Sequence, residues 1–297
     1  MFKMITILGL FLVSPNTLSA TNIDLDMASL VNDLMSGDNL IKKRINRSGK
    51  QRMLTQRMSK LALLISLNID KKVKQKNLLK FADMYDVTLK EFKKGDDAFD
   101  FSKENNIKIG KQIVIVEKLW KEFLENIQLV AHEKDKNDKA LNYIIANNVG
   151  LLKESNSLVS LYENANRSQN YMEKAMVNIV NVAGRQRMLT QKMTKEKLLC
   201  LKGEKGNRKA LIATIKLFDD SLHNLMNGSV NERLPKPSNK KIKDQLLIVK
   251  KLWDELKPLY ENKKLNPDSL AIIIKKNPIL LKEMNDVVTL VEVETEY

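Results

Sequence analysis

The sequence is poor in the residues on which several common folds and sites depend. Of its 297 residues, one is a cysteine (Cys200) and two are histidines (His132 and His223). This excludes a disulfide framework and a cysteine-rich metal site, and it leaves little room for histidine-based zinc or acid–base chemistry. Ten glycines, six prolines and 5 % aromatic residues also argue against sandwiches, barrels and Rossmann sheets, which need turn residues and strand formers.

Long apolar runs are lacking as well. The run over residues 4–13 is too short to span a membrane, and no later segment reaches that length. A basic start, this apolar run, Pro15 and a small residue at Ala20 together predict a secretory signal over residues 1–20. An N-terminal helix that is not cleaved is the alternative. We therefore expect an exported, periplasmic protein.

Acidic residues are outnumbered, with 36 Asp and Glu against 51 Lys and Arg and a net charge of +15. Such a charge suits nucleic acid or an anionic surface. An exported protein does not meet chromosomal DNA, so we expect no nucleic-acid partner. Because 42 of the 51 cations are lysines, the charge indicates solvated helix faces, or attraction to anions or to the outside of a membrane.

What the sequence does contain is a tandem repeat. Residues 46–60 read NRSGKQRMLTQRMSK and residues 181–195 read NVAGRQRMLTQKMTK, with ten of fifteen positions identical. Three further blocks follow in the same order, with offsets that drift from 133 to 129: residues 85–89 with 218–222, 116–120 with 249–253, and 151–154 with 280–283. Four ordered matches indicate a duplication, with the length differences in loops.

Each repeat divides into four amphipathic stretches separated by Gly, Pro and Asn-Asp breaks. They are residues 25–68, 73–94, 104–130 and 137–165, then 166–201, 206–227, 238–262 and 267–294. This pattern predicts an all-α protein of two up-and-down four-helix bundles, with domains at residues 21–165 and 166–297. Because no proline interrupts residues 139–201, we expect one long helix there that joins the bundles end to end.

The repeated motif has two faces at 100° per residue. Opposite the face for its own bundle lie a glycine, an arginine and a glutamine in both copies: Gly49, Arg52 and Gln56, then Gly184, Arg187 and Gln191. Small residues let helix backbones approach closely, which predicts a second helix–helix interface. An arginine and a glutamine are costly there unless something pairs with them.

Arginine usage points to the same motif. Five of the nine arginines fall within its 30 residues: Arg47, Arg52, Arg57, Arg185 and Arg187. A guanidinium differs from an ammonium in its planar fork of donors, which fits oxyanions. One interpretation is therefore an oxyanion site. The other is that Arg52 and Arg187 make structural hydrogen bonds to carboxylates or carbonyls within the bundle.

The strings over residues 49–58 and 184–193 resemble the signature of the N-terminal domain of type IV pili methyl-accepting chemotaxis transducers. That PilJ-like domain is similar to the periplasmic sensor domain of nitrate/nitrite sensor kinases. The resemblance implies an all-helical, non-enzymatic sensor module. It also implies that the arginines matching Arg52 and Arg187 bind the anion across a dimer interface.

We therefore expect a soluble, exported sensory module without catalytic residues, metal or cofactor. Its expected site joins Arg52 and Arg187 to Gln56 and Gln191 as supporting donors, with Gly49 and Gly184 allowing close approach. Expected partners are a small oxyanion, a second copy bound through the first helices, and a membrane chemoreceptor or sensor kinase. A structural or protein-interaction module without a small ligand is the alternative.

Overall fold

The computed structural model describes residues 40–95, 103–165, 171–203, 206–263 and 267–294. The predicted signal over residues 1–20 and the first part of the first predicted helix lie outside the described residues. Within them the regular structure is helical, apart from one isolated bridge between Ser229 and Leu234. The predicted all-α class is confirmed.

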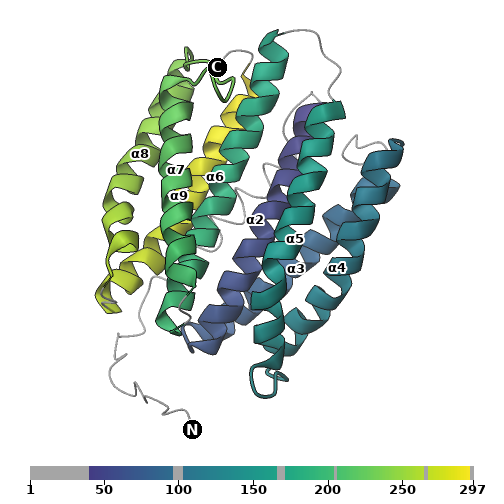
Figure 1. The fold of residues 1–297 in the computed structure, drawn as a ribbon, viewed down its shortest axis with the longest axis vertical. Coiled ribbons are helices and arrows are strands. Elements are labelled where there is room, and N and C mark those ends of the chain that lie inside the picture. The colour runs from purple at the N-terminus through teal and green to yellow at the C-terminus, as the bar shows by residue number, and fades with distance from the viewer. Residues whose placement is uncertain (1–39, 96–102, 166–170, 204–205, 264–266, 295–297) are drawn as a thin grey trace.

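Each repeat forms an up-and-down bundle of four helices, drawn from purple to yellow along the chain in Figure 1. The first repeat comprises α2 (Leu40–Ser66), α3 (Lys71–Lys94), α4 (Ile107–Ala131) and α5 (Lys139–Ala165). The second comprises α6 (Tyr171–Leu201), α7 (Asn207–Asn227), α8 (Lys240–Glu261) and α9 (Pro267–Val293). Seven of the eight helices begin within a few residues of the predicted positions, and α2 is described from Leu40 onward.

Equivalent residues end and begin the helices of the two repeats. The side chain of Asn106 accepts hydrogen bonds from the first backbone amides of α4, and Asn239 does the same for α8. Gly95 and Gly228 end α3 and α7 with a φ of 81°, a conformation that glycine adopts without steric cost. The duplication therefore extends to the turn chemistry.

Each bundle has its own aromatic core at matching positions. The rings of Tyr85 and Trp120 are 4.2 Å apart in the first repeat, and those of Phe218 and Trp253 are 4.4 Å apart in the second. Both indoles donate a hydrogen bond to an aspartate on the neighbouring helix, at 3.0 Å in the first repeat and 2.8 Å in the second. Each repeat thus buries a core by itself, with the polar edge of its indole satisfied.

The two bundles lie side by side, with α2 against α6 in the middle of the molecule (Figure 1). Hydrogen bonds join Asn46 in the first part of α2 to Arg187 in the middle of α6, and Ser66 at the end of α2 to Lys202 just after the end of α6. The residue numbers of the contacts rise together along both helices. The helices therefore run parallel, and equivalent residues of the two repeats face each other.

The predicted continuous helix over residues 139–201 is wrong. The helix α5 ends at Ala165 and α6 begins at Tyr171. Arg44 stacks on Tyr162 while Arg52 bonds Asn156, so α5 runs antiparallel to α2 and hence to α6. The chain reverses between α5 and α6. The reason is energetic: an end-to-end arrangement leaves the second faces of α2 and α6 in water, whereas side-by-side packing buries both.

The predicted second interface of the motif is confirmed, but its location differs from the prediction. It is formed by α2 and α6 of one chain, not by the first helices of two copies. This corrects the prediction that two copies associate through these faces, because each face is already covered by its counterpart in the other repeat.

Candidate functional site

The two motif arginines meet at the centre of the α2–α6 interface. Arg52 is 2 % exposed and Arg187 is 0 % exposed. A Cβ atom added to Gly49 would lie 3.3 Å from Nη2 of Arg52 and 3.7 Å from Nη2 of Arg187. At Gly184 the order is reversed, with 3.3 Å to Arg187 and 3.6 Å to Arg52. Both guanidinium groups thus lie between the helix backbones, where the two glycines leave room for them.

Four hydrogen bonds run from the two guanidinium groups to oxygens of asparagine side chains or of the backbone. Each arginine donates one bond within its own repeat, to an asparagine of the fourth helix, and one bond across the interface. The four bonds run from Arg52 Nη1 to Asn156 Oδ1 (2.9 Å), from Arg52 Nη2 to the Asn181 carbonyl (3.4 Å), from Arg187 Nη1 to Asn285 Oδ1 (2.8 Å) and from Arg187 Nη2 to Asn46 Oδ1 (2.6 Å).

Two carboxylates are connected to the arginines through the asparagines that bridge the interface. Glu163 accepts a hydrogen bond from the side chain of Asn181 at 2.6 Å, and Glu292 accepts one from the side chain of Asn46 at 2.8 Å. The two glutamates are 129 residues apart, the same offset as between the fourth helices of the repeats. Each asparagine therefore stands between an arginine and a glutamate, and the arrangement is closely symmetric.

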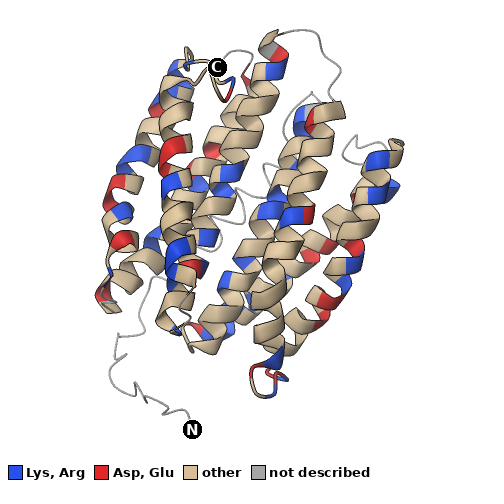
Figure 2. Ribbon diagram, in the orientation of Figure 1, with Lys and Arg blue, Asp and Glu red and all other residues tan. Residues whose placement is uncertain are grey.

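Burial makes the centre of the α2–α6 interface an unfavourable place for positive charge. It lowers the pKa of Arg52 to about 9, an effect that Glu163 opposes and that the positive charge of Arg187 increases. The Nε atom of Arg52 is buried and has no hydrogen-bond partner among the residues that the structure describes. Burial also raises the pKa of Glu163. Lys and Arg occur along all the helices, the central pair included (Figure 2), but at Arg52 the charge is removed from water.

The predicted glutamines belong to a second polar cluster, one turn along each helix. The Oε1 atom of Gln56 accepts a hydrogen bond from Nζ of Lys195 at 2.8 Å, and that of Gln191 accepts one from Nζ of Lys60 at 2.5 Å. The structure therefore brings Gln56 and Gln191 together with the lysine of the opposite repeat, whereas Arg52 and Arg187 bond asparagines.

Residues 39–144 and 151–274 match the family described as type IV pili methyl-accepting chemotaxis transducer N-term. The chain belongs to this family. Each of the two matches contains one copy of the motif, which confirms the tandem resemblance. No curated protein and no solved structure matches the chain.

Sequence reasoning missed several residues that this tandem transducer domain brings into its interface. They are the lysines that end the motif and the asparagines and glutamates of the fourth helices: Lys60, Lys195, Asn148, Asn277, Asn156, Asn285, Glu163 and Glu292. A signal was available for the asparagines, since residues 144–156 and 273–285 share the pattern II-x-x-N-x-x-LLKE-x-N. Repeated polar residues on an apolar helix face mark positions that are buried with a partner.

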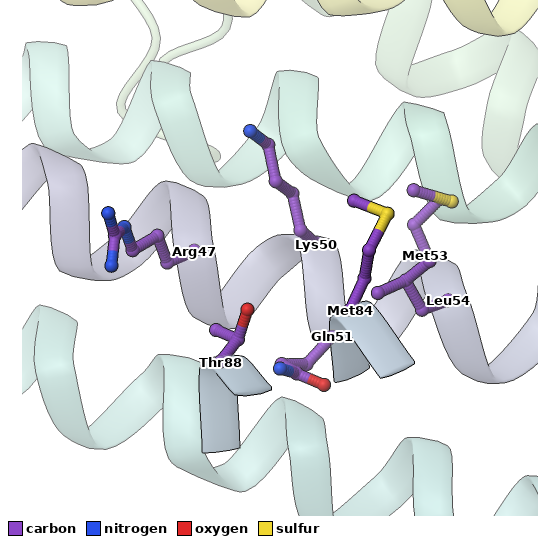
Figure 3. Close-up of a pocket in the computed structure, with 7 residues that line it drawn as sticks. All are labelled: Arg47, Lys50, Gln51, Met53, Leu54, Met84 and Thr88. Atoms are coloured by element: carbon purple, nitrogen blue, oxygen red, sulfur yellow. The ribbon is translucent and has the colours of Figure 1, made fainter. Parts of the chain in front are cut away.

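The pocket in Figure 3 lies away from this interface, between α2 and α3, and has a volume of about 10 Å³. That volume holds one water molecule at most. Its lining residues are Arg47, Lys50, Gln51, Met53, Leu54, Met84 and Thr88. A wider groove of about 760 Å³ runs along α7 and α8 beside residues 229–232. None of the predicted site residues lines either one.

The remaining residues with chemically reactive side chains are the two histidines and the cysteine. His132 and His223 are exposed, and Cys200 packs partly buried against the core. In the described part of the chain, no group of three His, Cys, Asp or Glu residues is arranged to hold a metal ion. Of the helices described, none combines the length and the apolar character needed to cross a membrane.

Proposed function

We propose that this sensory domain binds one small oxyanion of the nitrate or nitrite type between Arg52 and Arg187. The supporting observation is the pairing of two buried guanidinium groups across the α2–α6 interface. Arg52 forms no ion pair in the described part of the chain, and the charge of Arg187 disfavours its ionised form. An anion between the two groups relieves that repulsion and offers a fork of donors its natural partner.

The proposed site is complete within one chain. In the nitrate-sensing proteins that the motif resembles, each protomer contributes one arginine. Here both arginines belong to the same polypeptide, as equivalent residues of two repeats. Binding then requires no self-association, and the expected stoichiometry is one anion per chain at this site.

Binding is proposed to alter how α2 and α6 sit against each other. Both helices contribute to the site, so an anion that binds one arrangement more tightly shifts the population toward it. The exported domain would pass this change to a membrane chemoreceptor or sensor kinase. The family supports a sensory and non-catalytic role, and export rests on the predicted signal over residues 1–20.

A structural role without a ligand is the second candidate. It is favoured by the observation that the terminal nitrogens of both guanidinium groups already donate to asparagine or backbone oxygens. In that case the arginines only join the repeats. The two candidates differ in one measurable property, because only the first predicts that an anion stabilises the fold beyond its ionic strength.

A thermal-shift screen separates them. Nitrate, nitrite, sulfate, phosphate and small carboxylates are compared with chloride at equal ionic strength, because a net charge of +15 makes any salt stabilising. At a free ligand concentration 100 times Kd, the folded state gains about 2.7 kcal/mol. Arg52→Ala and Arg187→Ala should lose that gain. Arg185→Ala is the matched control, since Arg185 lies in the same motif but bonds Glu232 near the surface. If no anion exceeds chloride, the oxyanion proposal fails.

A further inference from the structure

The helix α8 lies at the outer edge of the second bundle and packs mainly against α7 and α9 (Figure 1). Its outward face carries two adjacent apolar residues, Leu247 and Ile248, which are 56 % and 47 % exposed. Charged residues extend this apolar pair in both directions and complete one exposed stripe at helical spacing, which consists of Lys240, Asp244, Leu247, Ile248, Lys251 and Glu255. Burial of the apolar pair against another apolar surface is favourable.

The first repeat has an apolar pair at the equivalent place. Val114 and Ile115 on α4 are 55 % and 45 % exposed. The two stripes therefore share their apolar centre, and they differ in the charges around it. This difference decides which of the two stripes can pair with a copy of itself.

The charges of the α8 stripe are complementary to those of a second, antiparallel α8. When the two helices are centred on their apolar pairs, each residue faces the one that lies equally far beyond the centre. Asp244 and Lys251 each lie three positions from the apolar pair, and Lys240 and Glu255 each lie seven positions from it. Every charge of the stripe therefore faces a charge of opposite sign, and the two-fold symmetry makes each pair occur twice.

The α4 stripe lacks this complementarity. Lys111 and Lys118 each lie three positions from its apolar pair, and both are positive. At seven positions Ile107 would face Glu122, which forms no ion pair with it. Two α4 helices in the same arrangement would thus bring like charges together, which is unfavourable. Association through α8 alone ends with two copies, whereas association through both helices would continue without closing.

We propose that two copies of this chain associate through α8, with the two helices antiparallel and their apolar pairs packed at the centre. Within one chain Asp244 pairs with Lys240 at 2.5 Å, and Glu255 pairs with Lys276. These pairs are exposed and contribute little by themselves, so the second copy's Lys251 can join Asp244. One helix from each copy forms a small interface, so we expect a reversible dimer that depends on concentration.

Sedimentation equilibrium of the whole protein and its charge variants tests the pairing. Lys251→Asp places acids against each other and should raise the Kd of the dimer about tenfold or more. The substitution also lowers the net charge of +15 on each copy, which by itself favours association, so weaker association cannot arise from net charge. Asp244→Lys/Lys251→Asp reverses both charges at the wild-type net charge and should restore the dimer. Lys118→Asp is the matched control, because it makes the same charge change at the equivalent position of α4.

Three results would overturn the inference. The first is a wild type that remains monomeric at its highest soluble concentration. The second is a dimer that Lys251→Asp leaves unchanged or that Lys118→Asp weakens as much, because the contact then includes another surface. The third is a double variant that does not recover, because the antiparallel pairing of the charges is then wrong.

Cross-linking locates the contact independently of affinity. Ile248→Cys in a Cys200→Ala background places one thiol at the centre of the proposed interface, where a short bismaleimide can join two copies. Ile115→Cys in the same background is the control, because Ile115 is exposed to nearly the same degree on α4. Cross-linked dimer from Ile248→Cys alone supports the inference, and equal yields from the two variants, including none from either, overturn it. No anion takes part in these tests, so their outcome is independent of the proposed function.

Discussion

Arg52 and Arg187, which are 135 residues apart in sequence, lie together between two parallel helices of one chain. The duplication thereby builds within one polypeptide an interface of equivalent faces, of the kind that two copies of a single-repeat protein would form. Covalent linkage makes the pairing intramolecular, so it does not depend on protein concentration. This relationship leads to expectations for association, packing, pH dependence and ligand affinity.

The first prediction concerns association. Because the motif faces are covered within the chain, Gly49→Leu and Gly184→Leu should leave the sedimentation coefficient of the folded protein unchanged. Analytical ultracentrifugation over a range of concentrations measures this. If the variants sediment as a smaller species than wild type, the faces pair between chains and the intramolecular arrangement is contradicted.

The second prediction concerns packing at the same glycines. A leucine at position 49 places its side chain where the two guanidinium groups lie, so Gly49→Leu should lower the free energy of unfolding by about 1–3 kcal/mol. Gly150 in the middle of α5 is the control, because a Cβ atom there meets no atom of the described residues within 4 Å. Gly150→Ala should therefore raise stability by about 0.5–1 kcal/mol. Urea unfolding measures both, and equal effects at the two sites would contradict the close approach.

The third prediction is a pH dependence caused by Lys195. Its pKa is about 8 in the folded protein against 10.5 as the ordinary value, so the unfolded chain holds more protons between these two pH values. The free energy of unfolding should therefore rise as pH increases from about 8 to about 10.5, by up to about 3 kcal/mol. Below about pH 8 the full cost of the buried charge is present.

The measurement is the difference between Lys195→Met and wild type at each pH, from urea unfolding. Subtraction removes the contribution of other groups, including Tyr85 and Tyr260, whose pKa is raised by burial. The free energy of unfolding of the variant should exceed that of wild type by the most below pH 8, and this difference should shrink toward pH 10.5. A difference that stays constant with pH would show that Lys195 is not buried as a charged group.

The fourth prediction concerns the glutamate next to the arginine pair. Glu163 raises the pKa of Arg52 and lies one asparagine away from it, so it opposes the entry of an anion. Glu163→Gln should increase anion affinity several-fold, which corresponds to roughly 1 kcal/mol for a charge at this distance in a partly buried site. Titration of nitrate or sulfate measures the change. Weaker binding in Glu163→Gln would mean that the carboxylate positions the site through Asn181.

Much of the fold was predictable because it is encoded locally. Helix lengths follow from the spacing of apolar residues, and Gly95, Asn106, Gly228 and Asn239 act on the backbone within a few residues of themselves. The face of the motif that carries Gly49 and Arg52 was also predictable, since 100° per residue is a property of any α-helix. The function of Glu292 was not, because its partner Asn46 lies 246 residues away.

By itself the sequence determined the helices, the duplication and the identity of the face that each motif presents, because these depend on local periodicity and on comparison of one repeat with the other. Only the tertiary structure decided that the bundles lie side by side. Residues 139–201 contain no proline, so periodicity allowed one helix there, yet α5 and α6 run in opposite directions. The side-by-side arrangement is favoured because the second faces of α2 and α6, each polar at its centre, lose the least free energy when they are buried against each other. This stabilisation belongs to the pair of faces, so no single stretch of sequence contains it.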